Sequence, residues 1–576
     1  MEKQLMLGNE AVARGAWEAG CRVVSSYPGT PSTEVTESAA KYPDMYCEWA
    51  VNEKVSLELC AGAAVAGARA MCAMKHVGVN VAADPLFTLS YTGVNGGLVM
   101  VAADDPGMHS SQNEQDSRCY ARAAHLPLLE PADSQECLDF TALAFELSER
   151  FDAPVMLRLT TRVAHARMPV ALGERLAAPL KPYRKDIAKY VMMPAMARSR
   201  HVAVEARMNA LAEYAEGCPV NRVEMRDTRI GVISSGMAYQ YVREALPEAS
   251  VLKLGMVHPL PRRMIERFAA SVDRLLVIEE LEPVIEDQLA GWGIMVTGKA
   301  LTGRQGELSV NRLRSVLGLP EAERRAMPAV PPRPPVMCAG CPHRGPMTVL
   351  KKLKLTVTGD IGCYTLGALA PVDALDTSLC MGASIGMAQG FERADAANAA
   401  RTVAVIGDST FLHTGVNALI SAAFNQARTT VMILDNSITA MTGHQPNPNS
   451  GRNLSGERPP IDLAALCLAC GVRRVRKVDA FDLAALEAAL KEETAADELS
   501  VIIAGRPCAL LDKSRRPAFR VDPEKCRGCW RCIKLSCPAI SKAGKVSRID
   551  EVQCAGCGLC VQTCPFGAIG KAGGEV

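Results

Sequence analysis

The stretch TVAVIGDSTFLHTGVNALISAAFNQARTTVMILDN, residues 402–436, decides the fold class of this 576-residue chain. Residues 402–406 and 430–434 are apolar runs with the length of buried strands, and residues 411–427 between them have a helical composition. A strand, a helix and a second strand form a right-handed βαβ unit, in which the strands are parallel. Similar alternation surrounds the strand-like runs 22–26, 229–234 and 275–278. The chain is therefore predicted to be an α/β protein whose parallel sheets are covered by helices on both faces.

A polar residue follows each strand of this unit. Asp408 comes after the first strand, and Asn436 comes 28 residues later, after the second. The carboxyl ends of parallel strands meet at one edge, where open α/β sheets bind ligands. A carboxylate and an amide oxygen suit Mg²⁺, which completes its shell with phosphate oxygens. A chance Gly-Asp pair after a buried strand is the alternative, but the complete βαβ unit favours a metal-diphosphate site.

The same stretch resembles the thiamine-diphosphate motif, Gly-Asp-Gly followed one βαβ unit later by Asn. Gly407, Asp408 and Asn436 match that motif, whereas Ser409 stands in place of its second glycine. The resemblance implies that Asp408, Asn436 and the backbone oxygen of Ile438 bind Mg²⁺. Gly407 is expected to let the backbone approach the ligand, and Ser409 leaves both metal-binding side chains in place.

Thiamine chemistry also needs a carboxylate against the pyrimidine ring, because that contact promotes the imino tautomer that deprotonates the thiazolium carbon. In this enzyme class the pyrimidine half lies on a separate domain. Residues 52–67 resemble the helix used there, which opens with Asn-Glu and is rich in small residues. Glu53 is predicted to be the carboxylate. The alternatives are Glu58 on the same helix, or a Glu53 that is merely a solvated first-turn residue.

The last 51 residues contain eight of the 22 cysteines, in two runs that each end in Cys-Pro. Their spacing is that of the bacterial two-cluster ferredoxins, in which the fourth cysteine of each run binds the other cluster. One 4Fe-4S cluster is thus expected on Cys526, Cys529, Cys532 and Cys564. The other is expected on Cys554, Cys557, Cys560 and Cys537. Zinc ribbons or disulfides are the alternative, but residues 521–526 and 549–554 repeat each other, as in a duplicated ferredoxin half.

The overall composition excludes several classes of protein. A net charge of +2 gives no sign of a nucleic-acid partner or an anionic membrane. No apolar run approaches the roughly 18 residues of a membrane helix, and the first residues lack the pattern of a signal peptide. Many cysteines without an export signal indicate a reducing cytoplasm and metal ligation. A cytoplasmic location is therefore expected.

A thiamine site and a two-cluster ferredoxin on one chain resemble the 2-oxoacid:ferredoxin oxidoreductases, and most closely the alpha subunits of the indolepyruvate-specific enzymes. The matching segments are 26–33, 74–80 with 84–85, 338–344, 381–386, 407–413 and 439–445. The resemblance implies thiamine diphosphate, Mg²⁺ and two 4Fe-4S clusters. It also implies oxidative decarboxylation of an arylpyruvate with coenzyme A, giving an aryl-acetyl-CoA and CO₂. The expected partners are a smaller beta subunit, in an α2β2-type heterodimer assembly, and an external ferredoxin.

The same resemblance implies a domain order. A pyrimidine-binding domain is expected at 1–185, a transketolase-C-like α/β domain at 195–325, and a Pro-rich linker at 326–346. A diphosphate- and Mg-binding domain is expected at 347–511, and a small α+β ferredoxin domain at 517–576. Both thiamine-binding domains are expected to be doubly wound parallel sheets.

Several further residues are candidates with alternatives. By resemblance, Thr30 contacts the substrate carboxylate or thiamine; otherwise it is a turn residue before Pro31. His76 is a candidate for binding the oxoacid, and so are His413, His444 and Asn80, although each histidine could equally hold a loop. Glycines 362, 382 and 386 are candidates for close packing around the diphosphate, with Gly382 preferred; ordinary contact between a helix and a sheet is the alternative.

Four further cysteines leave two interpretations open. Related oxidoreductases hold another cluster near thiamine with a Cys-x2-Cys pair and two later cysteines. The residues in comparable places are Cys338, Cys341, Cys363 and Cys508. Because Cys341 is followed by Pro-His in place of the usual glycine, structural cysteines remain the alternative to a third cluster.

The substrate class also stays open at this point. Pyruvate, a branched-chain oxoacid or 2-oxoglutarate would require the same chemistry and a different pocket. An electron carrier with a non-catalytic α/β scaffold is an alternative of another class. Intact Glu53, Asp408 and Asn436 favour the enzyme. A non-oxidative decarboxylase would have no use for the ferredoxin.

Overall fold

The computed structural model describes residues 3–321, 328–331, 334–514 and 516–572. They fall into two compact units, Met1–Met327 and Pro328–Val576, each described here by itself. No helix among the described residues is long and apolar enough to cross a membrane.

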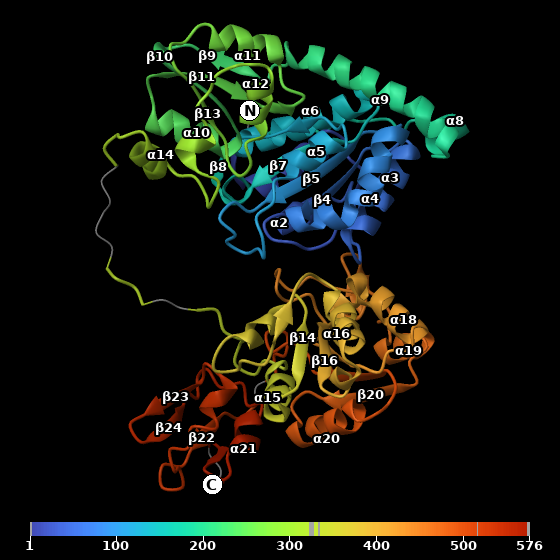
Figure 1. Ribbon diagram of the computed structural model, residues 1–576, viewed down its shortest axis with the longest axis vertical. Helices are drawn as coiled ribbons and strands as arrows, with labels where there is room; N and C mark the ends of the chain where they lie inside the picture. The colour runs from blue at the N-terminus through green and yellow to red at the C-terminus, as the bar shows by residue number, and fades with distance from the viewer. Residues whose placement is uncertain (1–2, 322–327, 332–333, 515, 573–576) are drawn as a thin grey trace. The chain divides into compact units, whose positions relative to one another are not determined.

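The first unit is built on a seven-stranded sheet of order β12-β6-β7-β5-β4-β2-β3. Figure 1 labels its strands β4, β5 and β7. All neighbours are parallel except the edge pair β12 and β6. The strands are β2 (Val23–Ser26), β3 (Tyr46–Trp49), β4 (Ala70–Lys75), β5 (Leu98–Asp104), β6 (Leu128–Leu129), β7 (Val155–Thr160) and β12 (Met256–His258). The continuous apolar runs of β4, β5 and β7 are buried along their whole length, as expected of a sheet covered on both faces.

Helices cover both faces of this sheet. One face packs against α1 (Gly8–Glu18), α2 (Thr33–Ala39) and α6 (Ser134–Phe151). The other packs against α3 (Glu53–Val65), α4 (His76–Thr92) and α5 (Ser117–Ala123). Successive residues of β4 alternate between the two cores: Met71 and Ala73 belong to the first, Cys72 and Met74 to the second. The prediction of a parallel sheet between two helical layers is confirmed for this unit.

A second sheet in the same unit has four strands in the order β13-β10-β11-β9. Its strands are β9 (Arg222–Glu224), β10 (Asp227–Ser235), β11 (Ala249–Leu254) and β13 (Leu275–Ile278). One face of this sheet packs against α10 (Gly236–Ala245) and α14 (Val310–Val316). The other face packs against α11 (Arg262–Ala269) and α12 (Val284–Gly291), in the same apolar core that contains α3 and α4. The remaining elements are β1 (Lys3–Leu7), β8 (Arg167–Ala171), α7 (Thr161–His165), α8 (Ile187–Tyr190), α9 (Pro194–Ala215) and α13 (Lys299–Thr302).

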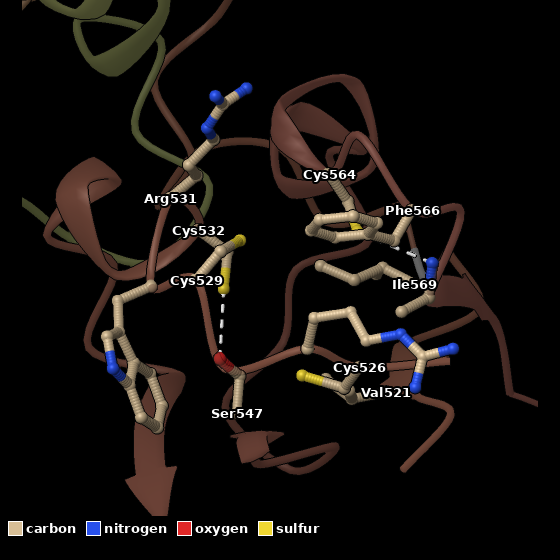
Figure 2. A pocket seen from close by; sticks show the side chains of 12 residues that line it. Val521, Cys526, Cys529, Arg531, Cys532, Ser547, Cys564, Phe566 and Ile569 are labelled. Carbon is tan, nitrogen blue, oxygen red and sulfur yellow. Dashed lines mark hydrogen bonds between the residues drawn. The ribbon is translucent and has the colours of Figure 1, made fainter. Parts of the chain in front are cut away.

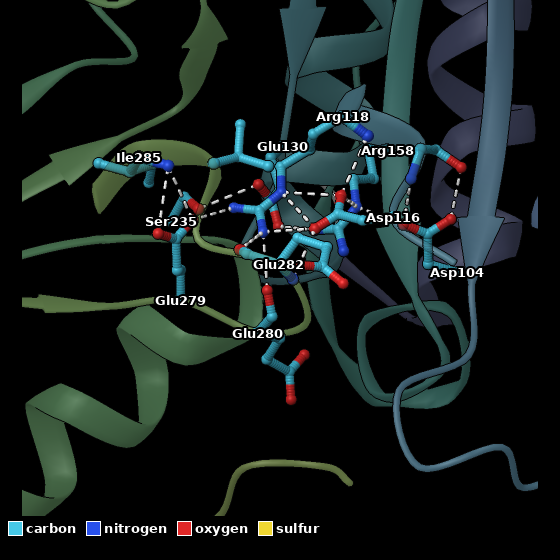
Figure 3. Close-up of polar contacts among 12 residues, drawn as sticks. Asp104, Asp116, Arg118, Glu130, Arg158, Ser235, Glu279, Glu280, Glu282 and Ile285 are labelled. Atoms are coloured by element: carbon cyan, nitrogen blue, oxygen red, sulfur yellow. Dashed lines mark hydrogen bonds and ion pairs between the residues drawn. The ribbon is translucent and has the colours of Figure 1, made fainter. Parts of the chain in front are cut away.

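A buried ion network joins the two sheets of this unit (Figure 3). Arg118 pairs with Asp116 and with Glu279 at 2.6 Å each, and all three side chains are essentially inaccessible. Arg158 donates from Nε to Asp104 at 2.6 Å and also pairs with Glu130. Because Glu279 follows β13 and the other groups belong to the first sheet, the network fixes one sheet on the other.

The second unit is built on a six-stranded, wholly parallel sheet of order β15-β14-β16-β17-β21-β20. Its strands are β14 (Thr356–Gly359), β15 (Thr377–Ser378), β16 (Thr402–Gly407), β17 (Thr430–Asp435), β20 (Arg474–Asp479) and β21 (Ser500–Gly505). Helices α15 (Arg344–Leu353) and α20 (Leu483–Thr494) cover one face, and α16 (Ala383–Ala394), α18 (Val416–Phe424) and α19 (Leu463–Ala469) cover the other. The predicted parallel strands at 402–406 and 430–434 are confirmed, because β16 and β17 are parallel neighbours.

Residues 408–424 between these strands are helical throughout. The order is α17 (Asp408–Thr410), a π-helical turn η3 (Phe411–Gly415) and α18. Such π turns are rare and are frequent at functional sites. Smaller elements are the 3₁₀ turns η1 (Cys363–Ala368) and η2 (Ala396–Asn398), and the hairpin of β18 (Arg452–Asn453) and β19 (Gly456–Glu457).

The segment predicted to be a Pro-rich linker, residues 326–346, ends earlier than predicted, because helix α15 begins at Arg344. Residues 326–327 and 332–333 lie outside the described residues. From Arg344 the chain is helical, and Pro346 sits in the first turn of α15, where proline is tolerated because no intrahelical donor is needed there.

The C-terminal segment has the two-fold repetition that its sequence predicted. It consists of the antiparallel pair β22 (Phe519–Val521) with β25 (Ile569–Lys571), the hairpin of β23 (Ile540–Ala543) and β24 (Val546–Ile549), and the short helices η4 (Ile533–Leu535) and α21 (Leu559–Thr563). It packs on the start of α20, where Gln562 bonds both Phe481 and Leu483. Phe481 and Leu483 also pack against the apolar cluster of this segment.

Candidate functional site

Asp408 and Asn436 lie at the carboxyl edge of the parallel sheet in the second unit. Gly407 of β16 is opposite Leu434 of β17, so the residues that follow these strands emerge side by side. Both side chains are buried, with Asp408 2% exposed. Ile438 and Ser409 are buried beside them, and Ser409 Oγ bonds Thr439 Oγ1 at 2.8 Å. The edge thus gathers the oxygen ligands that the motif predicts.

Two asparagines that sequence reasoning missed hold the Asp408 carboxylate. Asn447 and Asn449 donate from Nδ2 to Asp408 Oδ2 at 3.1 and 3.4 Å. Asn447 Oδ1 in turn accepts the backbone N–H of Asn449 at 2.9 Å, which fixes the turn. Both side-chain amides bond the same oxygen, and Asn449 Nδ2 also donates to Asp435 Oδ1 at 2.7 Å.

The electrostatics of Asp408 fit a bound cation. Burial, and next the neighbouring Asp435, raise the pKa of Asp408 to about 7. Its hydrogen-bond partners are amides, and among the described residues no lysine or arginine forms an ion pair with it. A buried carboxylate without a cation is unfavourable. The residues present therefore suit Mg²⁺.

The first turn of α16 lies at the same edge. Gly382 has φ +86°, and a Cβ there would lie 2.0 Å from Thr414 Oγ1, so only glycine fits. The N–H groups of Gly382 and Ser384 donate to Asp360 at 2.8 and 3.1 Å, while the buried Ser384 hydroxyl has no partner among the described residues. Gly407 instead faces the Tyr364 ring, because a Cβ placed at Gly407 would lie 2.8 Å from that ring.

In the first unit, Glu53 and Glu58 differ sharply although they share helix α3. Glu53 is the first helical residue, buried at 5% exposure, after the Asn52 cap that accepts from Val55 N–H at 2.9 Å. Its carboxylate lies against α4, where a Cβ on Gly78 would be 2.6 Å from Glu53 Oε1. Glu58 is exposed and pairs with Lys54 at 2.8 Å. The geometry favours Glu53 for a buried role.

Thr30 and His76 lie at the carboxyl edge of the first sheet, after β2 and at the start of α4. Thr30 is half-buried. His76 is fully buried, its Nε2 lies 3.2 Å from the Asn113 carbonyl oxygen, and its Nδ1 has no partner in the described part of the chain. Burial lowers the pKa of His76, so the neutral ring is favoured. Lys75, for which the sequence indicated no role, is also buried there, and its Nζ donates to the Ser110 carbonyl oxygen at 2.5 Å.

The other predicted polar candidates are less central. Asn80 is exposed and accepts a hydrogen bond from Tyr120. His413 is buried in the π-helical turn with Nδ1 3.3 Å from Thr414 Oγ1. His444 is half-buried with Nε2 3.8 Å from the sulfur of Cys508.

The eight C-terminal cysteines gather around two pockets. Figure 2 shows the pocket that we call the outer site, lined by Cys526, Cys529, Cys532 and Cys564. A second pocket, the inner site, is lined by Cys537, Cys554, Cys557 and Cys560. Gly340 and Arg344 from the start of this unit also line the inner site, whereas the outer site has only residues from Val521 onward. Each pocket thus brings together three cysteines of one run and the fourth of the other.

Cys338, Cys341, Cys363 and Cys508 form a third group in the second unit. Cys363 interacts electrostatically with both Cys338 and Cys508, and Cys341 with Cys338 and Cys363. Burial raises the pKa of Cys341 to about 12 and that of Cys363 to about 11. Cys508 N–H donates to the Asn436 carbonyl at 3.1 Å, so the group adjoins the Asp408 edge.

Over the described ranges, no three His, Cys, Asp or Glu side chains lie close enough to hold a single metal ion. A cubane keeps its four thiolates farther apart than the ligands of one ion, so cysteine quartets around a pocket are the relevant geometry.

Three segments of the chain match known protein families. Residues 14–215 match "Pyruvate flavodoxin/ferredoxin oxidoreductase, thiamine diP-bdg". Residues 360–504 match "Thiamine pyrophosphate enzyme, C-terminal TPP binding domain", and residues 518–565 match "4Fe-4S dicluster domain". These matches cover the Glu53 helix, the Asp408 edge and the cysteine pockets.

Full-length relatives are also found. The chain is 40% identical to indolepyruvate oxidoreductase subunit IorA of Pyrococcus horikoshii, over 99% of this chain and 97% of that protein. It is 42% identical to the subunit of the same name from Methanothermobacter thermautotrophicus, over 99% and 98%. A solved 2-oxoglutarate:ferredoxin oxidoreductase from Magnetococcus marinus superposes on 55% of this chain and 65% of its own, with a TM-score of 0.46 and 19% identity.

Proposed function

The chain belongs to the family of indolepyruvate oxidoreductase subunits named IorA, whose members are thiamine-diphosphate-dependent 2-oxoacid:ferredoxin oxidoreductases, and from this membership we propose its substrates and the roles of its residues. It oxidatively decarboxylates arylpyruvates, namely indolepyruvate and phenylpyruvate-type acids, with coenzyme A. The products are an aryl-acetyl-CoA, CO₂ and two electrons, which ferredoxin accepts. The observation that carries this proposal is the buried Asp408 carboxylate, which forms no ion pair with a described lysine or arginine, at a sheet edge on a chain that also has two cysteine quartets.

Asp408, Asn436 and the Ile438 carbonyl would hold Mg²⁺, which would supply positive charge for a diphosphate at this edge. Asn447 and Asn449 orient the carboxylate by binding its Oδ2. Gly382 and Ser409 line the diphosphate side of the same edge. When bound, thiamine diphosphate supplies a thiazolium that accepts the electron pair left by decarboxylation.

The Glu53 carboxylate would accept a hydrogen bond from the pyrimidine ring of the bound cofactor, which would supply the base that deprotonates the thiazolium carbon. Its burial and its position against Gly78 support a fixed carboxylate. Thr30 and His76 orient the oxoacid carboxylate and ketone. The buried His76 ring, whose pKa burial lowers and whose Nδ1 has no partner among the described residues, supports a hydrogen-bonding role.

The two cysteine pockets hold 4Fe-4S clusters, which accept single electrons. The grouping of each fourth cysteine with the other run supports the crossed ligand sets. Cys338, Cys341, Cys363 and Cys508 hold a third cluster beside the thiamine edge. Their mutual proximity, and the contact of Cys508 with Asn436, favour this interpretation over separate structural cysteines.

The proposed domains are the pyrimidine-binding domain 1–185, a transketolase-C-like domain 195–325 and the ferredoxin domain 517–576. The linker, predicted at 326–346, ends before α15 begins at Arg344, so the diphosphate domain, predicted at 347–511, begins with that helix. The separate sheet of β9, β10, β11 and β13 supports the middle domain. The enzyme works in the cytoplasm with a smaller beta subunit and an external ferredoxin.

The test is anaerobic viologen reduction by the complete complex, with indolepyruvate, phenylpyruvate, pyruvate and 2-oxoglutarate compared, each with and without coenzyme A. CoA-dependent reduction with the aryl acids alone supports the proposal. Preference for pyruvate, a branched-chain acid or 2-oxoglutarate overturns the substrate class and leaves the chemistry. No reduction by any acid, with iron and thiamine diphosphate bound, would favour an electron carrier on a non-catalytic scaffold.

A further inference from the structure

A buried arginine lies where the ferredoxin segment meets the rest of the second unit. Arg344 begins α15, and its side chain is 2% exposed. Its Nη1 donates to the Leu535 carbonyl oxygen at 2.6 Å. Its Nε and Nη2 donate to the Cys338 carbonyl at 3.2 and 3.1 Å, and Nη2 also to the Met337 carbonyl. The guanidinium therefore joins the ferredoxin segment to the Met337–Cys338 backbone.

The charge of Arg344 has no carboxylate partner in the part of the chain that is described. Its four hydrogen bonds all end on backbone carbonyls. Burial lowers the pKa of Arg344, and the ionisable groups that most oppose this effect are the thiols of Cys537, Cys341, Cys557 and Cys338. A guanidinium remains protonated in proteins, and a buried charge without a counter-charge is strongly unfavourable. A net negative group must therefore face it in the working enzyme.

The inner site meets that requirement. Arg344 lines the same pocket as Cys537, Cys554, Cys557 and Cys560. A 4Fe-4S core bound by four thiolates is net negative, and more so after it gains an electron. Because charges interact strongly over short distances away from water, a fixed positive charge stabilises the reduced state more than the oxidised one.

Building on the proposed function, we infer that Arg344 raises the reduction potential of the inner cluster and so draws electrons toward the ferredoxin segment. Its side chain undergoes no chemistry. The inner cluster gains one electron from the proposed third cluster beside the thiamine edge and loses one to the outer cluster, from which an external ferredoxin takes it. Arg344 is a positioning residue that acts through its charge.

The test is a redox titration of the complete, anaerobically purified complex, followed by electron paramagnetic resonance. The variants are Arg344→Gln, which removes the charge, and Arg344→Lys, which keeps it. In Arg344→Gln the inner cluster should lose at least tenfold in its preference for the reduced form, a shift of about 59 mV to more negative potential. Arg344→Lys should stay close to the wild-type potential.

A matched control removes the same charge at the outer site. Arg531 is exposed, and its guanidinium points away from the cysteines (Figure 2). Arg531→Gln should leave the inner potential unchanged, because solvent screens that charge. A Cys537→Ser variant identifies the inner signal by the change in its spectrum.

The outcomes separate this inference from the proposed function. An inner potential unchanged in Arg344→Gln, with normal iron content, overturns the inference and leaves the enzyme reaction intact. If Arg344→Gln loses its inner cluster, Arg344→Lys decides: a wild-type potential supports the inference, and a large negative shift shows that packing, not charge, matters. A wild-type complex without 4Fe-4S signals would instead overturn the proposed cluster sites.

Discussion

At the scale of single residues, the pKa of Asp408 makes metal binding depend on pH. Burial and then Asp435 raise that pKa to about 7, well above the usual carboxyl value of 3.8. Below pH 7 the carboxyl group therefore keeps a proton that Mg²⁺ must displace, so the apparent Mg²⁺ affinity should fall about tenfold per pH unit. Above pH 7 it should level off. Calorimetric titration of the cofactor-depleted complex between pH 5.5 and about 8.5 measures this.

Free thiamine diphosphate titrates in a similar range, so a variant must separate the two effects. Asp435→Asn leaves the cofactor unchanged and removes the neighbouring negative charge that raises the Asp408 pKa. The pH at which Mg²⁺ affinity levels off should move down in this variant. The same pH in both proteins would mean that the cofactor, and not Asp408, is the titrating group.

The two glutamates of α3 form a matched pair for a test of catalysis. Glu53→Gln keeps the size of a buried side chain but removes the carboxylate, and should lower indolepyruvate-dependent viologen reduction by about 100-fold or more. Glu58→Gln changes an exposed residue of the same helix and should have little effect. Deuterium exchange at the thiazolium carbon of the bound cofactor provides a second measurement. Normal exchange and activity in Glu53→Gln would exclude the proposed role.

At the scale of elements, close contact between two cysteine loops depends on one glycine. Gly340, between Cys338 and Cys341, has φ +72°, and a Cβ there would lie 2.6 Å from Ala555 Cβ in the inner-site loop. Gly340→Ala should force the loops apart and slow reduction of the C-terminal clusters by substrate, measured in a single turnover by freeze-quench spectroscopy. Reduction by dithionite, which needs no internal transfer, should remain.

Two further variants separate contact from backbone strain. Gly544→Ala has a similar φ of +60° and nothing within 4 Å, so it carries the conformational penalty alone. Gly340→Ala combined with Ala555→Gly removes the clashing methyl group and should recover part of the transfer rate. Equal slowing in Gly544→Ala, or no recovery in the double variant, would argue against the contact.

The elements also show what the sequence could and could not predict. Asp408 and Asn436 were predictable because parallel strands bring their carboxyl ends to one edge, and the cysteine runs because ligand spacing is local. The sequence could not predict Asn447 and Asn449, because they lie in a loop that has no periodic pattern. It could not predict the role of Arg344 either, because this side chain bonds a backbone carbonyl far away in the sequence. The Asn-Glu opening favoured Glu53 over Glu58 in the sequence, but only the structure shows that Glu53 is buried and Glu58 is exposed.

At the scale of the whole molecule, each unit joins separate layers by different means. In the second unit, backbone contacts from Arg344 and Gln562 attach the ferredoxin segment to the parallel sheet domain. In the first unit, the two sheets share an apolar core and a buried ion network. Buried ion pairs add little net stability but are very sensitive to loss of one partner. Loss of one partner from this network is therefore expected to destabilise the packing of the two sheets in the first unit.

Arg118→Met should expose that sensitivity. Although burial raises it, the pKa of Asp116 is held at about 2 by Arg118 and Arg158, so Asp116 stays ionised in the fold. Removing Arg118 leaves Asp116 and Glu279 as buried carboxylates without this partner, and should lower the local opening free energy by about 3–5 kcal/mol. Hydrogen exchange of β5 and β13 amides in the full-length protein measures this.

The pH dependence and a control make this prediction specific. Without Arg118 the pKa of Asp116 rises, so this carboxyl group takes up a proton when the pH is lowered. The loss of local opening free energy in Arg118→Met should therefore be smaller at pH 5 than at pH 8. Arg229→Met breaks an exposed pair with Asp227 and should leave exchange nearly unchanged. A deficit in Arg118→Met that does not vary with pH would indicate lost packing, because only an uncompensated charge can be relieved by a proton.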